Sequence, residues 1–244
     1  MWLRDIKAED MFRSLHKSLK GGFLVTLTQK LYTGAQEIWT QYLQHPFVCE
    51  MADGSLPLEK YRYYMLQDYL YLRDYVKIFA MSISKSNDFE QIQFLSDKMA
   101  ATLQETFRVH VPYMKRLGIT DEEIHQAIPH IENSSYTHYM IWEAQAGDIL
   151  SGLVALLNCS WSYAYIAQHL VERFPSAPQN TLYGDWFAGY ICEEYQQTNQ
   201  HLIDMVDEMG ADLSEEQTCK LCGIFKKCSQ YELKFWNTAY TMGA

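Results

Sequence analysis

Residues 153–163 read Leu-Val-Ala-Leu-Leu-Asn-Cys-Ser-Trp-Ser-Tyr and contain no charged side chain. They lie inside a longer segment, residues 149–174, that has the length and composition of an α-helix. A helix that is apolar around its whole circumference is buried in the core of a protein. We therefore expect residues 149–174 to cross the core, with the neighbouring segments packed around them.

The segments on both sides of this core helix also carry helical periodicity, and signals for β-strands are few. Pro, Gly and capping residues mark the helix ends. The other expected helices cover about residues 23–43, 58–84, 89–117, a short segment from 120, 134–145, 181–209 and 214–240. The sequence thus predicts an all-α, single-domain bundle of seven or eight helices over residues 23–244. Residues 1–22 are expected to form an N-terminal extension, whose role the sequence leaves open.

The composition is that of a folded, acidic protein. Hydrophobic residues make up 48% of the chain and charged residues 20%, which provides enough apolar material for a sizeable core. The formal net charge of −10, with no run of Lys and Arg, would repel phosphate backbones and anionic lipid. We find no stretch of about 18 apolar residues and no secretion signal. We therefore expect a cytoplasmic protein with reduced cysteines that binds neither nucleic acid nor membrane.

Motifs that could hold a metal occur once each and are not repeated along the chain. Cys219 and Cys222 form a C-x-x-C pair, but no second pair follows at zinc-finger spacing. Helical di-iron proteins repeat a Glu-x-x-His motif, whereas this chain has it once, at Glu122 and His125. A haem would need one His on a core face, and no feature singles out one of the three candidates, His16, His110 and His138. We expect no metal and no cofactor.

Cys159 lies in the middle of the expected core helix. A free Cys is often buried as a small hydrophobe, and this is the plainer interpretation of the residue. The alternative is a nucleophile, because polar residues surround the thiol in an otherwise apolar helix: Asn158, Ser160, Ser162 and Tyr163. Tyr163, four residues after Cys159, shares its helix face, so the Tyr163 hydroxyl could orient the thiol or a substrate atom.

Two carboxylates lie on aromatic helix faces. Asp68 is in the middle of an aromatic and aliphatic stretch, three residues before Tyr71. Because Asp is rarely buried unless it is paired, Asp68 either faces solvent or holds an amino or ring-nitrogen group of a ligand. Glu232 shares a face with Phe235 and Trp236. It is either a surface residue or a proton donor whose pKa is raised by burial.

Tyrosine is abundant, with 18 residues, many of them inside apolar helix patterns. A buried Tyr needs a partner for its hydroxyl, so a cluster of tyrosines suggests an interior pocket with polar groups. Tyr136 and Tyr190 are further candidates of this kind, although a place in the core is the plainer interpretation of either residue alone.

Five short motifs follow one another along the chain. They are His45-Pro46-Phe47 with Asp53-Gly54-Ser55-Leu56-Pro57, Tyr64-Met65-Leu66-Gln67-Asp68 with Tyr71-Leu72, Ala155-Leu156-Leu157-Asn158-Cys159-Ser160-Trp161 with Tyr163, Tyr183 with Trp186, Tyr190, Glu193 and Glu194, and Tyr231-Glu232 with Phe235-Trp236 and Ala239-Tyr240. In this order they resemble the motifs of the TenA family, the thiaminase II group of aminopyrimidine hydrolases. The similarity runs from about residue 24 to residue 241.

The resemblance implies a haem-oxygenase-like helical bundle that binds neither haem nor metal. It implies hydrolysis of 4-amino-5-aminomethyl-2-methylpyrimidine to the hydroxymethylpyrimidine in thiamin salvage. Cleavage of thiamin at the same methylene is the related activity. The resemblance also implies that the protein binds a small molecule, an aminopyrimidine or thiamin. It further implies that the chain forms a homotetramer.

The resemblance assigns a role to each candidate residue. Cys159 would be the nucleophile that adds to the pyrimidine ring, and Glu232 would be the acid/base that protonates the ring nitrogen or the leaving amine. The implied substrate-binding residues are Asp68 for the amino and nitrogen edge of the ring, Tyr71 and Tyr136 for its faces, and Tyr163 and Tyr190 for hydroxyls near the thiol and the carboxylates.

The chain departs from the family pattern at a few positions. Asn158 stands where Pro often precedes the Cys, and Phe187 follows Trp186 where Ile is usual. Neither change removes a proposed catalytic group, and the presence of Cys159 favours the thiol-dependent branch. Two other functions stay open from the sequence: a non-catalytic regulator that binds a pyrimidine, and a metal- or haem-dependent oxidase on the same fold.

Overall fold

A computed structural model describes residues 25–244, and all the regular elements in this range are helical. The α-helices are α2 (Leu27–Tyr42), α3 (Pro46–Asp53), α4 (Leu58–Ile83), α5 (Phe89–Glu105), α6 (Val111–Arg116), α7 (Asp121–Gln126), α8 (Ile131–Ala146), α9 (Ile149–Arg173), α10 (Gly184–Ile191), α11 (Glu193–Met209) and α12 (Glu215–Thr241). A π-helical turn, η1 (Thr106–His110), and a 3-10 turn, η2 (Ala177–Gln179), complete the set. The expected N-terminal extension, residues 1–22, lies outside the described residues.

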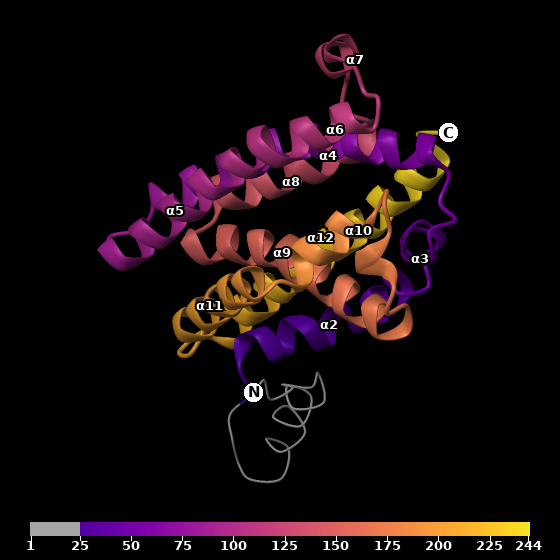
Figure 1. The fold of residues 1–244 in the computed structure, drawn as a ribbon. Helices are drawn as coiled ribbons and strands as arrows, with labels where there is room; N and C mark the ends of the chain where they lie inside the picture. Colours follow the sequence, from indigo (N-terminus) through magenta and orange to yellow (C-terminus); the bar gives the residue numbers. More distant parts are fainter. Residues whose placement is uncertain (1–24) are drawn as a thin grey trace, which may run out of the picture.

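Helix α9 is the centre of the bundle. It contacts α4 and α8 on one side and α10, α11 and α12 on others, and Figure 1 shows α4, α5 and α8 running along one side of it. The five residues 153–157 are completely buried. The expectation of a core-crossing helix at 149–174 is thus confirmed, as is that of an all-α bundle.

Among residues 25–244, α9 is long and apolar enough to span a membrane by length and composition. The sequence-based expectation that no such segment occurs was therefore too strict. However, 78% of the most apolar window of α9 is buried inside the protein. The apolar surface of α9 is used to pack the bundle, as in the core helix of a soluble protein.

Two expected helices are interrupted. The helix expected at 89–117 widens into the π-turn η1, directly before Pro112 in the first turn of α6. Pro112 cannot donate a backbone hydrogen bond to the preceding turn, so the regular ladder is broken there. The helix expected at 181–209 is split at Cys192, whose backbone is extended (φ −64°, ψ 151°).

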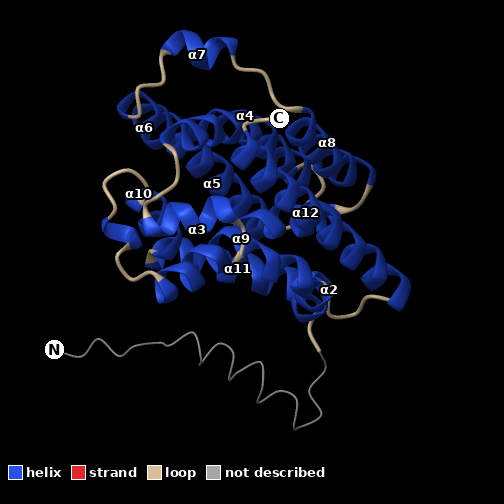
Figure 2. Ribbon diagram, turned by 90° about the vertical axis from the view of Figure 1, so that its right-hand side faces the viewer, coloured by secondary structure: helices blue, strands red, loops and turns tan. Residues whose placement is uncertain are grey.

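One short helix was not expected. In α3, Pro46 occupies the first turn, the His45 side chain caps the helix by accepting from the Phe47 N–H, and Gly54 ends it at φ 85°. These are ordinary start and stop signals, but they lie close together. The expected short helix from residue 120 is α7, which projects away from the other helices in both ribbon views (Figures 1 and 2).

Candidate active site

Cys159 lies on α9, where the residue as a whole is half-buried and its thiol is enclosed by the hydrophobic core. Burial raises the pKa of the Cys159 thiol well above its ordinary value, and the nearby Glu232 carboxylate adds to the rise. The Tyr71 hydroxyl, on α4, lies close enough to the thiol to offset part of this effect. The thiol is therefore protonated at neutral pH, and a nucleophilic role requires that its proton be removed during the reaction.

Glu232 lies on α12 and is 1% exposed. Burial raises the pKa of its carboxyl to about 8, with Asp68 adding to the rise and the Tyr136 and Tyr163 hydroxyls lowering it in part. Neither Oε1 of Glu232 nor the hydroxyl of Tyr136 has a partner within hydrogen-bonding geometry among residues 25–244. Glu232 is thus a carboxylic acid at neutral pH and can donate a proton.

Asp68, on α4, is buried and paired with His110. The Nε2 atom of His110 lies 2.6 Å from Oδ2 of Asp68, and both side chains are shielded from solvent. Burial by itself would lower the pKa of His110, but the hydrogen bond and charge of Asp68 outweigh this and raise it. His110 therefore holds one oxygen of Asp68, Oδ2, and leaves Oδ1 without a hydrogen bond from the described part of the chain.

The four tyrosines expected at the site lie around these groups. The rings of Tyr71 and Tyr136 are 5.3 Å apart, and those of Tyr163 and Tyr190 are 5.0 Å apart. The rings of Tyr71, Tyr136 and Tyr163 are buried, whereas Tyr190 is half-buried. Burial, followed by the Glu232 charge, raises the pKa of both Tyr136 and Tyr163 well above its ordinary value. Tyr190 lies closer to Asp68, whose charge contributes to its raised pKa after burial and Tyr64.

The structure therefore brings together all seven residues that the sequence singled out, from α4, α8, α9, α10 and α12. Three neighbours of the site had no such role in the sequence-based prediction, and one of them, His110, was considered there only as a haem ligand. They are His110, Tyr75, whose hydroxyl donates to the Leu156 carbonyl (3.0 Å), and Tyr195, whose hydroxyl donates to the Ser160 carbonyl (3.0 Å). Tyr75 follows Tyr71 by four residues, so helical periodicity could have identified it. For His110 the sequence offered a weaker signal: Pro112, two residues later, indicates an irregular helix at this point.

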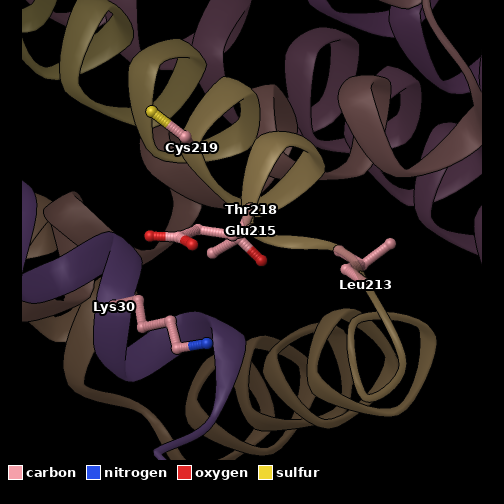
Figure 3. A pocket seen from close by; sticks show the side chains of 5 residues that line it. All are labelled: Lys30, Leu213, Glu215, Thr218 and Cys219. Carbon is pink, nitrogen blue, oxygen red and sulfur yellow. The ribbon is translucent and has the colours of Figure 1, made fainter.

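Of the side chains considered for a metal or a haem, His110 lies at this site, where its Nε2 atom is paired with Asp68. Within the described chain, no three His, Cys, Asp or Glu side chains are placed to hold a metal ion. Glu122, His125 and His138 are exposed. Cys219 lies elsewhere, in a surface hollow of about 500 Å³ that is also lined by Lys30, Leu213, Glu215 and Thr218 (Figure 3). His16 lies outside the described residues.

The fold and this constellation define an all-helical bundle that buries a thiol beside a protonated carboxyl. The chain belongs to the TENA/THI-4/PQQC family, whose sequence profile matches residues 32–242. It is similar to an aminopyrimidine aminohydrolase of Helicobacter pylori, with 37% identity over 88% of this chain and 98% of that protein.

Solved structures agree with this assignment. A TenA homologue from P. horikoshii OT3 superimposes with a TM-score of 0.80 at 30% identity, covering 90% of this chain and 100% of that one. A domain with a haem-oxygenase-like fold from Shewanella denitrificans superimposes with a TM-score of 0.71 over 89% of this chain and 96% of that one. Its identity is 15%, so the comparison concerns the fold alone. The expected haem-oxygenase-like bundle is thereby confirmed.

We predict that the His110–Asp68 pair stabilises the protein in a pH-dependent way. The pKa of His110 is higher in the folded protein than in the unfolded chain, where it is near 6.5. The stabilisation is therefore complete at a pH below the pKa of the unfolded state, and it is lost as the pH rises through the pKa of the folded state. The variant His110→Gln should lose about 1.5–3 kcal/mol of unfolding free energy at pH 6, and clearly less at pH 9. Urea denaturation of the variant and the wild type at pH 6 and at pH 9 measures the loss of unfolding free energy. A loss that is larger at pH 9 than at pH 6 would contradict the prediction.

Proposed function

We propose that this chain is a cofactor-free hydrolase that acts on 4-amino-5-aminomethyl-2-methylpyrimidine in thiamin salvage, with thiamin as a related substrate. The observation that carries the proposal is the buried pair of Cys159 and Glu232, a thiol and a carboxylic acid on facing helices. The names of the aminopyrimidine aminohydrolases among its relatives support the same substrate class.

The binding of an aminopyrimidine follows from the contacts of Asp68. Because His110 occupies Oδ2, the free Oδ1 of Asp68 can accept a hydrogen bond from the exocyclic amino group of the ring. The rings of Tyr71 and Tyr136 offer faces against which a flat heterocycle can pack. Tyr163 and Tyr190 supply hydroxyls near Glu232 and Asp68 respectively.

The first chemical step joins Cys159 to the ring. Glu232 in its acid form protonates a ring nitrogen while the sulfur of Cys159 bonds to a ring carbon, and the thiol proton replaces the one that Glu232 gave up. The net change is transfer of the thiol proton to the ring nitrogen with formation of one C–S bond, so the charge of the site is unchanged. The raised pKa values of Cys159 and Glu232 are compatible with this proton transfer, because both groups start protonated. A permanently ionised Glu232 would instead repel the thiolate that forms as the thiol loses its proton.

The second step replaces the amine. With aromaticity broken, the electron pair of the ring nitrogen expels ammonia from the protonated aminomethyl group. Water adds to the methylene and loses a proton, and the C–S bond then breaks as the ring becomes aromatic again. The ring nitrogen returns its proton to the sulfur through Glu232. Addition of the thiol thus divides one difficult displacement into easier steps.

We also propose that the chain acts in the cytoplasm as a homotetramer. The described surface exposes large apolar side chains that assembly could bury, among them Phe107, Val109, Ile131 and Trp142. Light scattering of the purified chain should therefore give about four times the chain mass of 28.6 kDa. A mass that stays at that of one chain over a wide concentration range would contradict the proposal.

Replacing Cys159 tests the nucleophile. We predict that Cys159→Ala abolishes release of the hydroxymethyl product from both the aminomethylpyrimidine and thiamin, because no C–S bond can form. Chromatography of the reaction measures it, with binding of the product as the control for an intact site. Full turnover by Cys159→Ala would refute the mechanism. Binding of the product by a wild-type protein that turns over neither substrate would instead identify a non-catalytic regulator.

The pH dependence tests the acid. Because Glu232 acts in its protonated form and its pKa is about 8, kcat/KM should fall as pH rises through about 8. The variant Glu232→Gln should lower kcat by about 10²–10⁴-fold and remove this alkaline limb. A pH profile that keeps the same limb in Glu232→Gln would assign it to another group.

A further inference from the structure

Asn158, directly before Cys159, is the centre of a buried polar cluster between α9 and α12. Its Nδ2 atom donates to the Ser229 hydroxyl at 2.7 Å and to the Phe225 carbonyl at 3.1 Å. Helix α2 adds two donors, since the Trp39 indole N–H reaches the Ser229 hydroxyl at 3.0 Å and the Tyr42 hydroxyl reaches the Ser229 carbonyl at 2.6 Å. All five residues are essentially inaccessible to solvent.

The orientation of the Asn158 amide is fixed by its partners. The Phe225 carbonyl can only accept, so it must face the NH₂ group and not the oxygen of the amide. The Ser229 hydroxyl donates to the same carbonyl at 3.0 Å, which leaves its lone pairs for Asn158 and Trp39. As a result, Oδ1 of Asn158 is buried with no hydrogen-bond partner within residues 25–244.

Stability alone does not explain an Asn at this position. A buried acceptor without a partner costs about 1–3 kcal/mol, whereas an apolar residue of similar shape would have no such penalty. Apolar packing between helices is non-directional and tolerates sliding or rotation of one helix against the other. A buried polar contact tolerates neither, because any displacement leaves its donor unpaired, and so it can fix the relative register of two helices.

The cluster adjoins both reacting groups. Cys159 is the next residue on α9, and Glu232 follows Ser229 on α12 by three residues, close to one helical turn. Tyr42 links the cluster to the site, since the pKa of its hydroxyl is raised first by burial and then by the charge of Glu232. A shift of α9 against α12 would therefore move the thiol and the carboxyl relative to each other.

We propose that Asn158 is a positioning residue that fixes α9 against α12 through Ser229 and thereby holds the Cys159 thiol beside the Glu232 carboxyl. The inference rests on the proposed function in that it concerns the same two reacting groups. It gives a role to the residue that stands where the family pattern often has Pro, which could not donate a side-chain hydrogen bond to α12.

Kinetics of Asn158→Leu provide the first test. The variant keeps the side-chain volume and removes the donor, so we expect kcat to fall by about 10- to 100-fold with KM changed by less than about threefold, as for a small misplacement of reacting groups. The matched control is Thr28→Val, which removes another interhelical hydrogen bond, from the Thr28 hydroxyl to Asp207 at 2.8 Å, between α2 and α11. Thr28→Val should leave kcat unchanged. Equal kcat in Asn158→Leu and wild type would overturn the inference.

A second readout needs no substrate. At the alkaline pH where the Cys159 thiol ionises, Glu232 is already charged, because its pKa is about 8. In the wild type, Glu232→Gln removes this charge, so it should lower the apparent pKa of Cys159. The pH dependence of iodoacetamide alkylation, followed by peptide mass, measures that pKa. In the Asn158→Leu background, Glu232→Gln should lower the apparent pKa of Cys159 by a smaller amount, because the carboxyl and the thiol are no longer held together. A shift of equal size in both backgrounds would refute the positioning role. Absence of turnover in the wild type would refute the proposed function and leave this readout valid.

If Asn158→Leu fails to fold, Ser229→Ala approaches the contact from α12. It removes the hydroxyl acceptor but leaves the Phe225 carbonyl as a partner for Asn158. We expect the same kinetic pattern with a smaller decrease in kcat. A wild-type kcat together with an unchanged response of Cys159 alkylation to Glu232→Gln would also overturn the inference.

Discussion

Exclusion of water by α9 is the constraint on which the rest of the structure depends. The helix buries apolar side chains on nearly every face, and burial of apolar surface is the main favourable term in folding, at roughly 25 cal/mol per Å². The same exclusion acts on the polar groups beside it. It raises the pKa of Cys159 and that of Glu232, so that one environment both holds the bundle together and keeps the two groups protonated.

A core of this kind requires that buried polar groups have partners, and neighbouring helices provide most of them. Tyr75 donates from α4 to a carbonyl of α9, and Tyr195 does so from α11. Asp68 is paired with His110, and Asn158 with Ser229. Within residues 25–244, the buried atoms left without partners include Oε1 of Glu232 and the hydroxyl of Tyr136, both at the proposed site of reaction. Unsatisfied atoms at such a place are consistent with groups that a substrate would contact.

The fold class and the core helix could be predicted from the sequence because both depend on local periodicity. Residues 149–174 were expected to be a buried helix and are one, apart from the last residue. The interruptions were harder to predict. The π-turn at 106–110 and the break at Cys192 depend on how the flanking helices pack, since Pro112 alone does not decide between a kink, a turn and a helix end. The π-turn nonetheless includes His110, the partner of Asp68.

By itself, the sequence determined the residue types of the site and the helices that carry them, because motifs and helical periodicity are local. It identified Cys159, Asp68 and Glu232, but it left open whether Cys159 only fills the core and whether Asp68 and Glu232 face solvent. Only the tertiary structure decided which side chains meet, because contacts between helices join residues far apart in the chain. Asp68 and His110 are separated by 42 positions, and Asn158 and Ser229 by 71. The raised pKa of Glu232 is likewise a tertiary property, since it results from removal of water by all the surrounding helices together.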